Sequence, residues 1–80
     1  MPRFFFHVED RPDDEGTELP SVAAAKCEAV RYAGKLICDE ADTFWDSAEF
    51  GMVVTDEKGL ILFSLTLSGT EAPAIRMAGR

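Results

Sequence analysis

The N-terminal segment Met1–Val8 restricts the possible folds more than any other part of the chain, because three consecutive phenylalanines fill its centre. The segment is too short for a stable helix, and acidic residues, a proline and a glycine follow it. An apolar run with these boundaries is typical of a strand. Alternation divides its side chains between two faces, Phe4, Phe6 and Val8 on one and Phe5 and His7 on the other. Since both faces carry apolar groups, we expect a small sheet that needs a cover on each side.

Length and charge exclude several classes of function. A chain of 80 residues forms one domain with a modest core, and self-association often stabilises such small domains. The apolar fraction of 46% is that of a folded protein. Its 8 basic and 15 acidic residues give a net charge of −7, which opposes binding to nucleic acid or to an anionic membrane. We therefore expect a folded acidic protein with neither of these partners.

The two cysteines are predicted to be free. Cys27 and Cys38 fall on one predicted helix, about 16 Å apart along its axis, whereas a disulfide needs Cα atoms within about 7 Å of each other. We expect half-buried, unreactive thiols in a reducing compartment. No stretch approaches the roughly 20 apolar residues of a membrane span, and the N-terminus lacks the apolar core and cleavage site of a signal peptide. These features predict a cytoplasmic location.

An acidic loop and then a long amphipathic helix are predicted to follow the first strand. Residues 9–20 contain helix breakers and form the loop, within which residues 16–19 can pair briefly with the first strand. Ser21 is a suitable N-cap for a helix from Val22 to about Asp42. The stripe that faces the core is rich in alanine and comprises Val22, Ala25, Ala29, Ala33, Leu36 and Ile37, with Val30 at its edge.

The acidic segment 39–46 is predicted to end the helix and to connect it to the next strand. Carboxylates near a helix C-terminus oppose the helix dipole, which favours termination there. Phe44 and Trp45 stand within this segment. We favour a role for these two rings in closing the end of the core over a role as anchors for a partner.

Residues 48–67 are predicted to form a β-hairpin. One face of its first strand carries Phe50, Met52 and Val54, and one face of its second strand carries Ile61, Phe63, Leu65 and Leu67. The intervening Asp56-Glu57-Lys58-Gly59 suits a type I turn followed by a left-handed residue.

These elements predict a two-layer α+β domain over residues 1–67, with one helix on a mostly antiparallel sheet of three to four strands. Residues 68–80 show no periodicity and are predicted to be a flexible tail. The sheet face away from the helix stays half apolar. We take it as a candidate dimer or partner surface, formed by Phe5, His7, Val53, Leu60 and Leu62. The alternative is that the acidic loop or the tail folds over this face.

Four blocks of the sequence occur in the order of a known family. They are Met1–Val8, Asp14–Pro20, Ala23–Ala29 and Val54–Gly59. In this order they resemble a family of short bacterial proteins of unknown function. Those proteins begin with Pro-Arg-aromatic-Phe-Phe-His-Val, continue with Glu-Gly-x-Glu-Leu-Pro and end in a Val-Thr-Asp-x-x-Gly hairpin. The resemblance covers most of residues 1–67, and because no activity is assigned to the family it implies no catalytic residue.

Two groups of residues are candidates for chemistry. His7, the only histidine, would serve as a general base or metal ligand, although we favour a place on the sheet surface or in a dimer contact. The loop carboxylates offer oxygen ligands for Ca²⁺ or Mg²⁺, but their spacing matches no calcium loop, and we favour a solvated turn. These carboxylates belong to Glu9, Asp10, Asp13, Asp14, Glu15 and Glu18. We predict no catalytic residue, no metal site and no cofactor.

The function that fits these observations is that of a small, non-enzymatic protein-interaction or regulatory module. It is predicted to act as a homodimer, and a further protein partner is possible. The alternative is a small-ligand or metal-binding protein that uses His7 and the acidic loop 9–18. The identity of a partner or ligand does not follow from the sequence.

Overall fold

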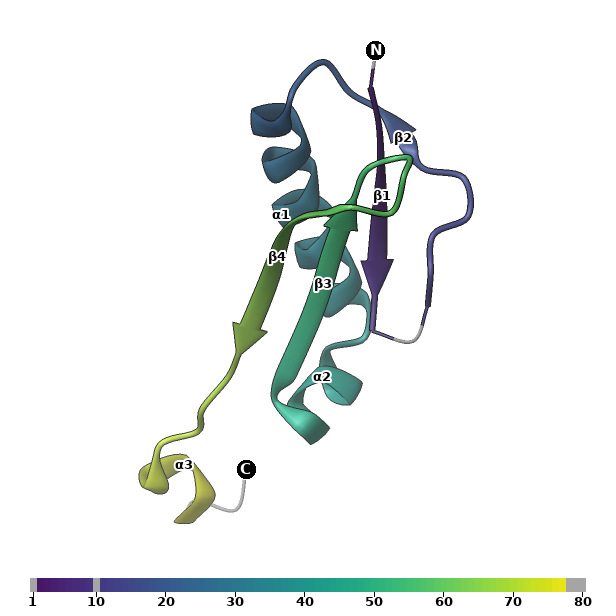
Figure 1. Cartoon of the computed structure of the whole chain (residues 1–80). Helices are drawn as coiled ribbons and strands as arrows, with labels where there is room; N and C mark the ends of the chain where they lie inside the picture. Colours follow the sequence, from purple (N-terminus) through teal and green to yellow (C-terminus); the bar gives the residue numbers. More distant parts are fainter. Residues whose placement is uncertain (1, 10, 78–80) are drawn as a thin grey trace.

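The computed structural model describes residues 2–9 and 11–77, which form a four-stranded antiparallel sheet with helices packed beside it (Figure 1). The elements are β1 (Arg3–Val8), β2 (Thr17–Glu18), α1 (Val22–Asp39), α2 (Ala41–Ser47), β3 (Glu49–Thr55), β4 (Ile61–Ser68) and α3 (Pro73–Met77). The strands lie in the order β2-β1-β3-β4. The predicted α+β fold is confirmed, and so is the short extended pairing of the loop with the first strand, as β2.

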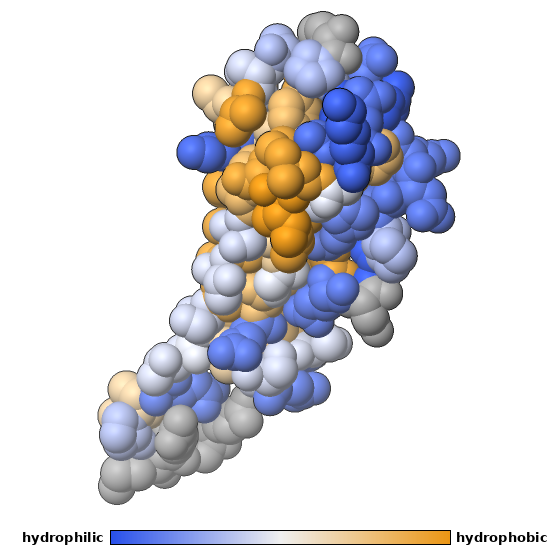
Figure 2. Space-filling view, viewed as in Figure 1, coloured by the Kyte–Doolittle hydropathy of each residue, from blue (hydrophilic) through white to orange (hydrophobic). Residues whose placement is uncertain are grey.

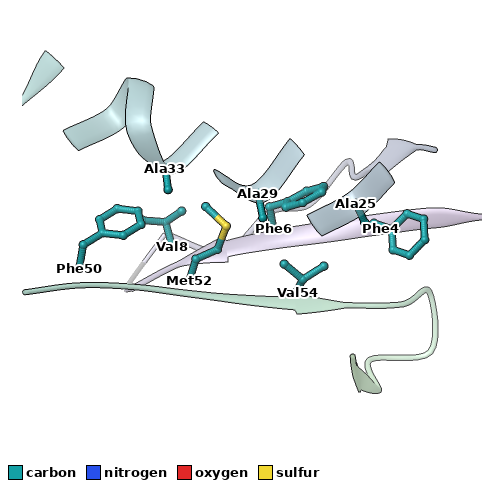
Figure 3. Close-up of a cluster of buried hydrophobic side chains, with 9 residues drawn as sticks. All are labelled: Phe4, Phe6, Val8, Ala25, Ala29, Ala33, Phe50, Met52 and Val54. Atoms are coloured by element: carbon teal, nitrogen blue, oxygen red, sulfur yellow. The ribbon is translucent and has the colours of Figure 1, made fainter. Parts of the chain in front are cut away.

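The core lies between α1 and the two central strands. Ala25, Ala29 and Ala33 are each at most 1% exposed and follow one another at four-residue spacing along one helix face. Facing them are the larger side chains of the sheet, Phe4, Phe6, Val8, Phe50, Met52 and Val54 (Figure 3). Since alanine side chains are short, the helix backbone approaches the sheet closely, and β1 and β3 supply most of the core volume.

The alanine-rich stripe is confirmed at its centre and is weaker at its start. Leu36 and Ile37 pack against the core and are partly buried. Val22 is 45% exposed and lines a surface hollow beside Phe4. Val30, predicted at the edge of the stripe, is 61% exposed. The helix begins as predicted, because the Ser21 side chain accepts a hydrogen bond from the Ala24 amide at 3.1 Å.

The hairpin turn between β3 and β4 is held by one carboxylate. Asp56 Oδ1 accepts hydrogen bonds from the amides of Lys58 and Leu60, at 2.8 and 2.9 Å. The Gly59 amide donates to the Asp56 carbonyl at 3.1 Å, and Gly59 has a φ of 83°, which glycine adopts without strain. The predicted left-handed residue at the end of this turn is confirmed.

A β-bulge after the turn changes the predicted faces of β4. Val54 pairs with Phe63, but Thr55 pairs with Ile61, so Leu62 is an extra residue on β4. Because of the bulge, Ile61 does not share a sheet face with Phe63, Leu65 and Leu67. Leu62 packs against the core instead. The predicted faces of Ile61 and Leu62 are therefore wrong, because alternation was assumed to continue through the strand.

The helix end also differs from the prediction. α1 ends at Asp39 instead of near Asp42, and residues 41–47 form the separate helix α2. Glu40 separates the two helices with a non-helical backbone (φ −123°, ψ 45°). The change of direction brings Phe44 onto the end of the core, as predicted for this ring. Both cysteines are free, as predicted, but they are exposed and not half-buried.

The two edges of the sheet are unlike each other. β2 is only two residues long and pairs with the start of β1. The ion pair between Arg3 and Glu18, at 3.2 Å, fixes charged side chains at this edge. β4 is eight residues long and contains no charged side chain. Short, charged edges resist further strand pairing, whereas long uncharged edges favour it.

The molecule is elongated because its C-terminal part leaves the core. Its radius of gyration is 15.1 Å, against about 12 Å for a compact domain of this length. Figure 1 shows the end of β4 and α3 extending away from α1. The region predicted to be a flexible tail thus contains a short helix, Pro73–Met77. Within residues 2–9 and 11–77, no helix has the length and apolar character to cross a membrane.

We expect enlargement of the central alanine of α1 to destabilise the fold. In the Ala29→Leu variant, the added atoms would push α1 off the sheet, at a cost of about 1–3 kcal/mol in the free energy of unfolding. Chemical denaturation followed by circular dichroism measures this loss. The matched control is Ala23→Leu on the exposed side of the same helix, where the change should stay within about 0.5 kcal/mol. Equal losses for the two variants would contradict the close-packed core.

Candidate interaction surfaces

The open face of the sheet brings together three of the five residues predicted for a dimer or partner surface. His7 lies opposite Val53 on the neighbouring strand, and the rings of Phe5 and His7 are stacked with centroids 6.5 Å apart. All three side chains are half-buried. Leu60 lies just after the turn and is 63% exposed, whereas Leu62 packs on the other side of the sheet. The five residues predicted for this surface therefore do not lie on one face of the sheet.

The acidic loop covers the β1 part of this face. The Asp13 amide donates to His7 Nδ1 at 3.1 Å, so the proton of the neutral ring lies on Nε2, which is 3.0 Å from Thr55 Oγ1. Gly16 packs against the ring of Phe5, since a Cβ at Gly16 would lie 2.9 Å from Phe5 Cε2. The acidic loop therefore folds over this part of the face, which was the alternative stated from the sequence. This contact accounts for the partial burial of Phe5 and His7.

Asp13 fastens this loop to β1. One carboxylate oxygen accepts from the Phe6 amide at 3.1 Å, and the other accepts from the amides of Glu15 and Gly16, both at 3.0 Å. Burial raises the pKa of this carboxyl, but the backbone hydrogen bonds from Gly16, Phe6 and Glu15 together bring it below its ordinary value. The ionised carboxylate thus stabilises the folded loop.

The residues suggested for a metal site do not gather into one. Both ring nitrogens of His7 already have hydrogen-bond partners, and the Asp13 carboxylate is occupied by amides. Across the described ranges, no group of three histidine, cysteine, aspartate or glutamate side chains is placed to hold a metal ion. Asp10 lies outside the described residues. The geometry of His7 and Asp13 is that of a structural clamp.

The most exposed apolar side chains of the sheet lie at the start of β4. Leu60 and Ile61 are 63% and 64% exposed, and Figure 2 shows an apolar patch in this region, next to the charged turn. Further along β4, the residues on the open face are the hydroxyl side chains of Ser64 and Thr66. The helix side of β4 is less covered than that of β3, since Leu67 is 38% exposed and its partner Phe50 only 8%.

A groove lies between α2 and the segment that leads into α3. Its volume is about 690 Å³, and its lining residues are Asp42, Trp45, Asp46, Thr70, Glu71, Ala72 and Ile75. Phe44 and Trp45 pack edge to face, with ring centroids 5.4 Å apart. Phe44 is partly buried against the core, while Trp45 is 44% exposed and lies against Gly69. The two rings could be identified from the sequence, but this groove could not, because α3 lies in the segment without periodicity.

We expect the stabilisation by Asp13 to depend on pH. Because the pKa of this carboxyl is lower in the folded chain, its contribution is complete above the unfolded value of about 3.9 and is lost as the pH falls through the folded value. The Asp13→Ala variant should lose roughly 1–2 kcal/mol at pH 7. This loss should shrink below about pH 4. Thermal unfolding measured from pH 7 to pH 3 tests this.

The control for this experiment is Asp14→Ala, which removes the neighbouring, exposed acid. It should leave the stability at pH 7 within about 0.5 kcal/mol of the starting value. A loss of stability that is equal in the two variants, or that does not change with pH, would contradict the role of the Asp13 carboxylate in holding the loop on β1.

Comparison with known proteins gives one match. A family model described as a domain of unknown function (DUF6894) matches residues 3–68, which span β1 to the end of β4. No curated protein and no solved structure matches the chain. The match agrees with the resemblance seen in the sequence blocks and covers most of the chain. The chain belongs to the family of this domain of unknown function (DUF6894).

Proposed function

We propose that this chain is a non-enzymatic protein-interaction module that acts as a homodimer, and that two copies join edge to edge through β4. The main observation that supports this proposal is the length and the uncharged composition of this edge strand. β4 runs over Ile61–Ser68 without a charged side chain, and only one of its edges, the one toward β3, is paired in the described chain. The backbone groups on its other edge are open to a further strand.

A second copy of β4 complements this edge. In an antiparallel pair centred on Leu65, Phe63 of one copy lies opposite Leu67 of the other, and Ser64 lies opposite Thr66. Apolar side chains then meet on the helix side, where they are incompletely covered. Hydroxyl side chains meet on the open side. This register also pairs the whole regular part of β4 after the bulge, so it uses the strand fully.

The charge distribution supports contact at this edge over contact elsewhere. The chain has a net charge of −7, so most approaches of two copies bring like charges together. β4 is a neutral stretch of eight residues. The remaining repulsion between the copies is long-ranged and is screened by salt, so dimerisation should become tighter as the salt concentration rises.

The decisive test is the oligomeric state of a variant with a charged edge. We expect the unaltered chain to sediment as a dimer at high micromolar concentration. Thr66→Lys places a lysine on the exposed side of β4, close to the same lysine of the second copy, and should weaken the dimer by roughly tenfold or more. Sedimentation velocity over a range of concentrations measures this change.

The matched control is Thr43→Lys, the same substitution at an exposed position of α2. It should leave the dimer intact, and circular dichroism shows whether both variants keep the fold. A chain that stays monomeric at high micromolar concentration would contradict the dimer. A dimer that tolerates Thr66→Lys would contradict its location at β4.

A further inference from the structure

The groove between α2 and α3 combines exposed apolar surface with an acidic border. Trp45 and Ile75, on opposite sides of the groove, are 44% and 51% exposed. Large apolar side chains that stay this exposed in a hollow are frequent anchor points for partners. Asp42, Asp46 and Glu71 also line the groove. The groove is therefore a place where an apolar side chain can be buried next to negative charge.

The arrangement of the two aspartates favours a cation near the indole ring. Asp42 and Asp46 stand four residues apart, on one side of α2, with Trp45 between them in the sequence. Neither aspartate forms an ion pair with a cation among the side chains that the structure describes, those of residues 2–9 and 11–75. A lysine or arginine over the face of Trp45 would gain from the ring and from both carboxylates.

We propose that this groove binds a basic segment of a partner protein, in which lysine or arginine alternates with an apolar side chain. The apolar side chain packs between Trp45 and Ile75, and the cations meet the acidic border. The opposite charge of such a segment also favours its approach to a chain with a net charge of −7. This surface is separate from the outer edge of β4, so the inference holds for a monomer as well as for a dimer.

The intrinsic fluorescence of Trp45, the only tryptophan, reports binding directly. We expect its emission to shift when the full chain is titrated with a synthetic six-residue peptide of alternating lysine and leucine. A peptide of alternating glutamate and leucine should leave the emission unchanged. Added salt should weaken the binding of the lysine peptide, because the attraction between opposite charges is screened.

Two double variants distinguish the contribution of the groove carboxylates to peptide affinity from the contribution of the net charge. Asp42→Asn with Asp46→Asn should weaken binding of the lysine peptide roughly tenfold, since two close charge partners are lost. Asp14→Asn with Asp39→Asn changes the net charge equally, at exposed positions outside the groove, and should alter the affinity by less than about twofold. Circular dichroism checks that both variants keep the fold.

Three results would overturn the inference. They are an unchanged Trp45 emission with the lysine peptide, equal binding of the glutamate peptide, and an equal loss of affinity in the two double variants. Salt should weaken peptide binding and strengthen the β4 dimer, so the failure of one proposal is distinguishable from the failure of the other. Sedimentation of the chain with and without the lysine peptide shows whether peptide binding and β4 dimerisation occur independently.

Discussion

The close contact between the alanine face of α1 and the central strands is the interaction on which the rest of the structure depends. Ala25, Ala29 and Ala33 bring the helix onto β1 and β3, whose side chains make up most of the core. One narrow helix does not cover four strands equally, so the cover weakens toward β4. The same packing that stabilises the centre of the domain thus leaves the edge strand β4 without a full cover.

The layers of this fold follow from patterns within single segments. Alternation in the first strand, the alanine stripe, the Ser21 cap and the Asp56–Gly59 turn each depend on neighbouring residues, and the sequence predicted them. The bulge at Leu62 and the break between the helices at Glu40 were not predicted. The hydrophobic pattern does not locate either one, because Ile61 and Leu62 are both apolar and the residues around Glu40 are mostly polar.

The surfaces were harder to predict than the core for the same reason. Phe5 and His7 have the sequence features of an exposed pair, but Gly16 and the Asp13 clamp bring the acidic loop over them. The groove at Trp45 depends on where α3 lies relative to α2, and no sequence pattern in that segment indicates it. The uncharged length of β4 is visible in the sequence. Its position at the edge of the sheet is not, because strand order is a property of the fold.

The difference between the two sheet edges limits how large an assembly can become. The β2 edge has two residues and an ion pair between Arg3 and Glu18, which makes it a poor template for another strand. If copies join through β4, each copy uses its one suitable edge on a single neighbour. Growth then stops at a closed pair, whereas a sheet with two receptive edges would extend into a fibre.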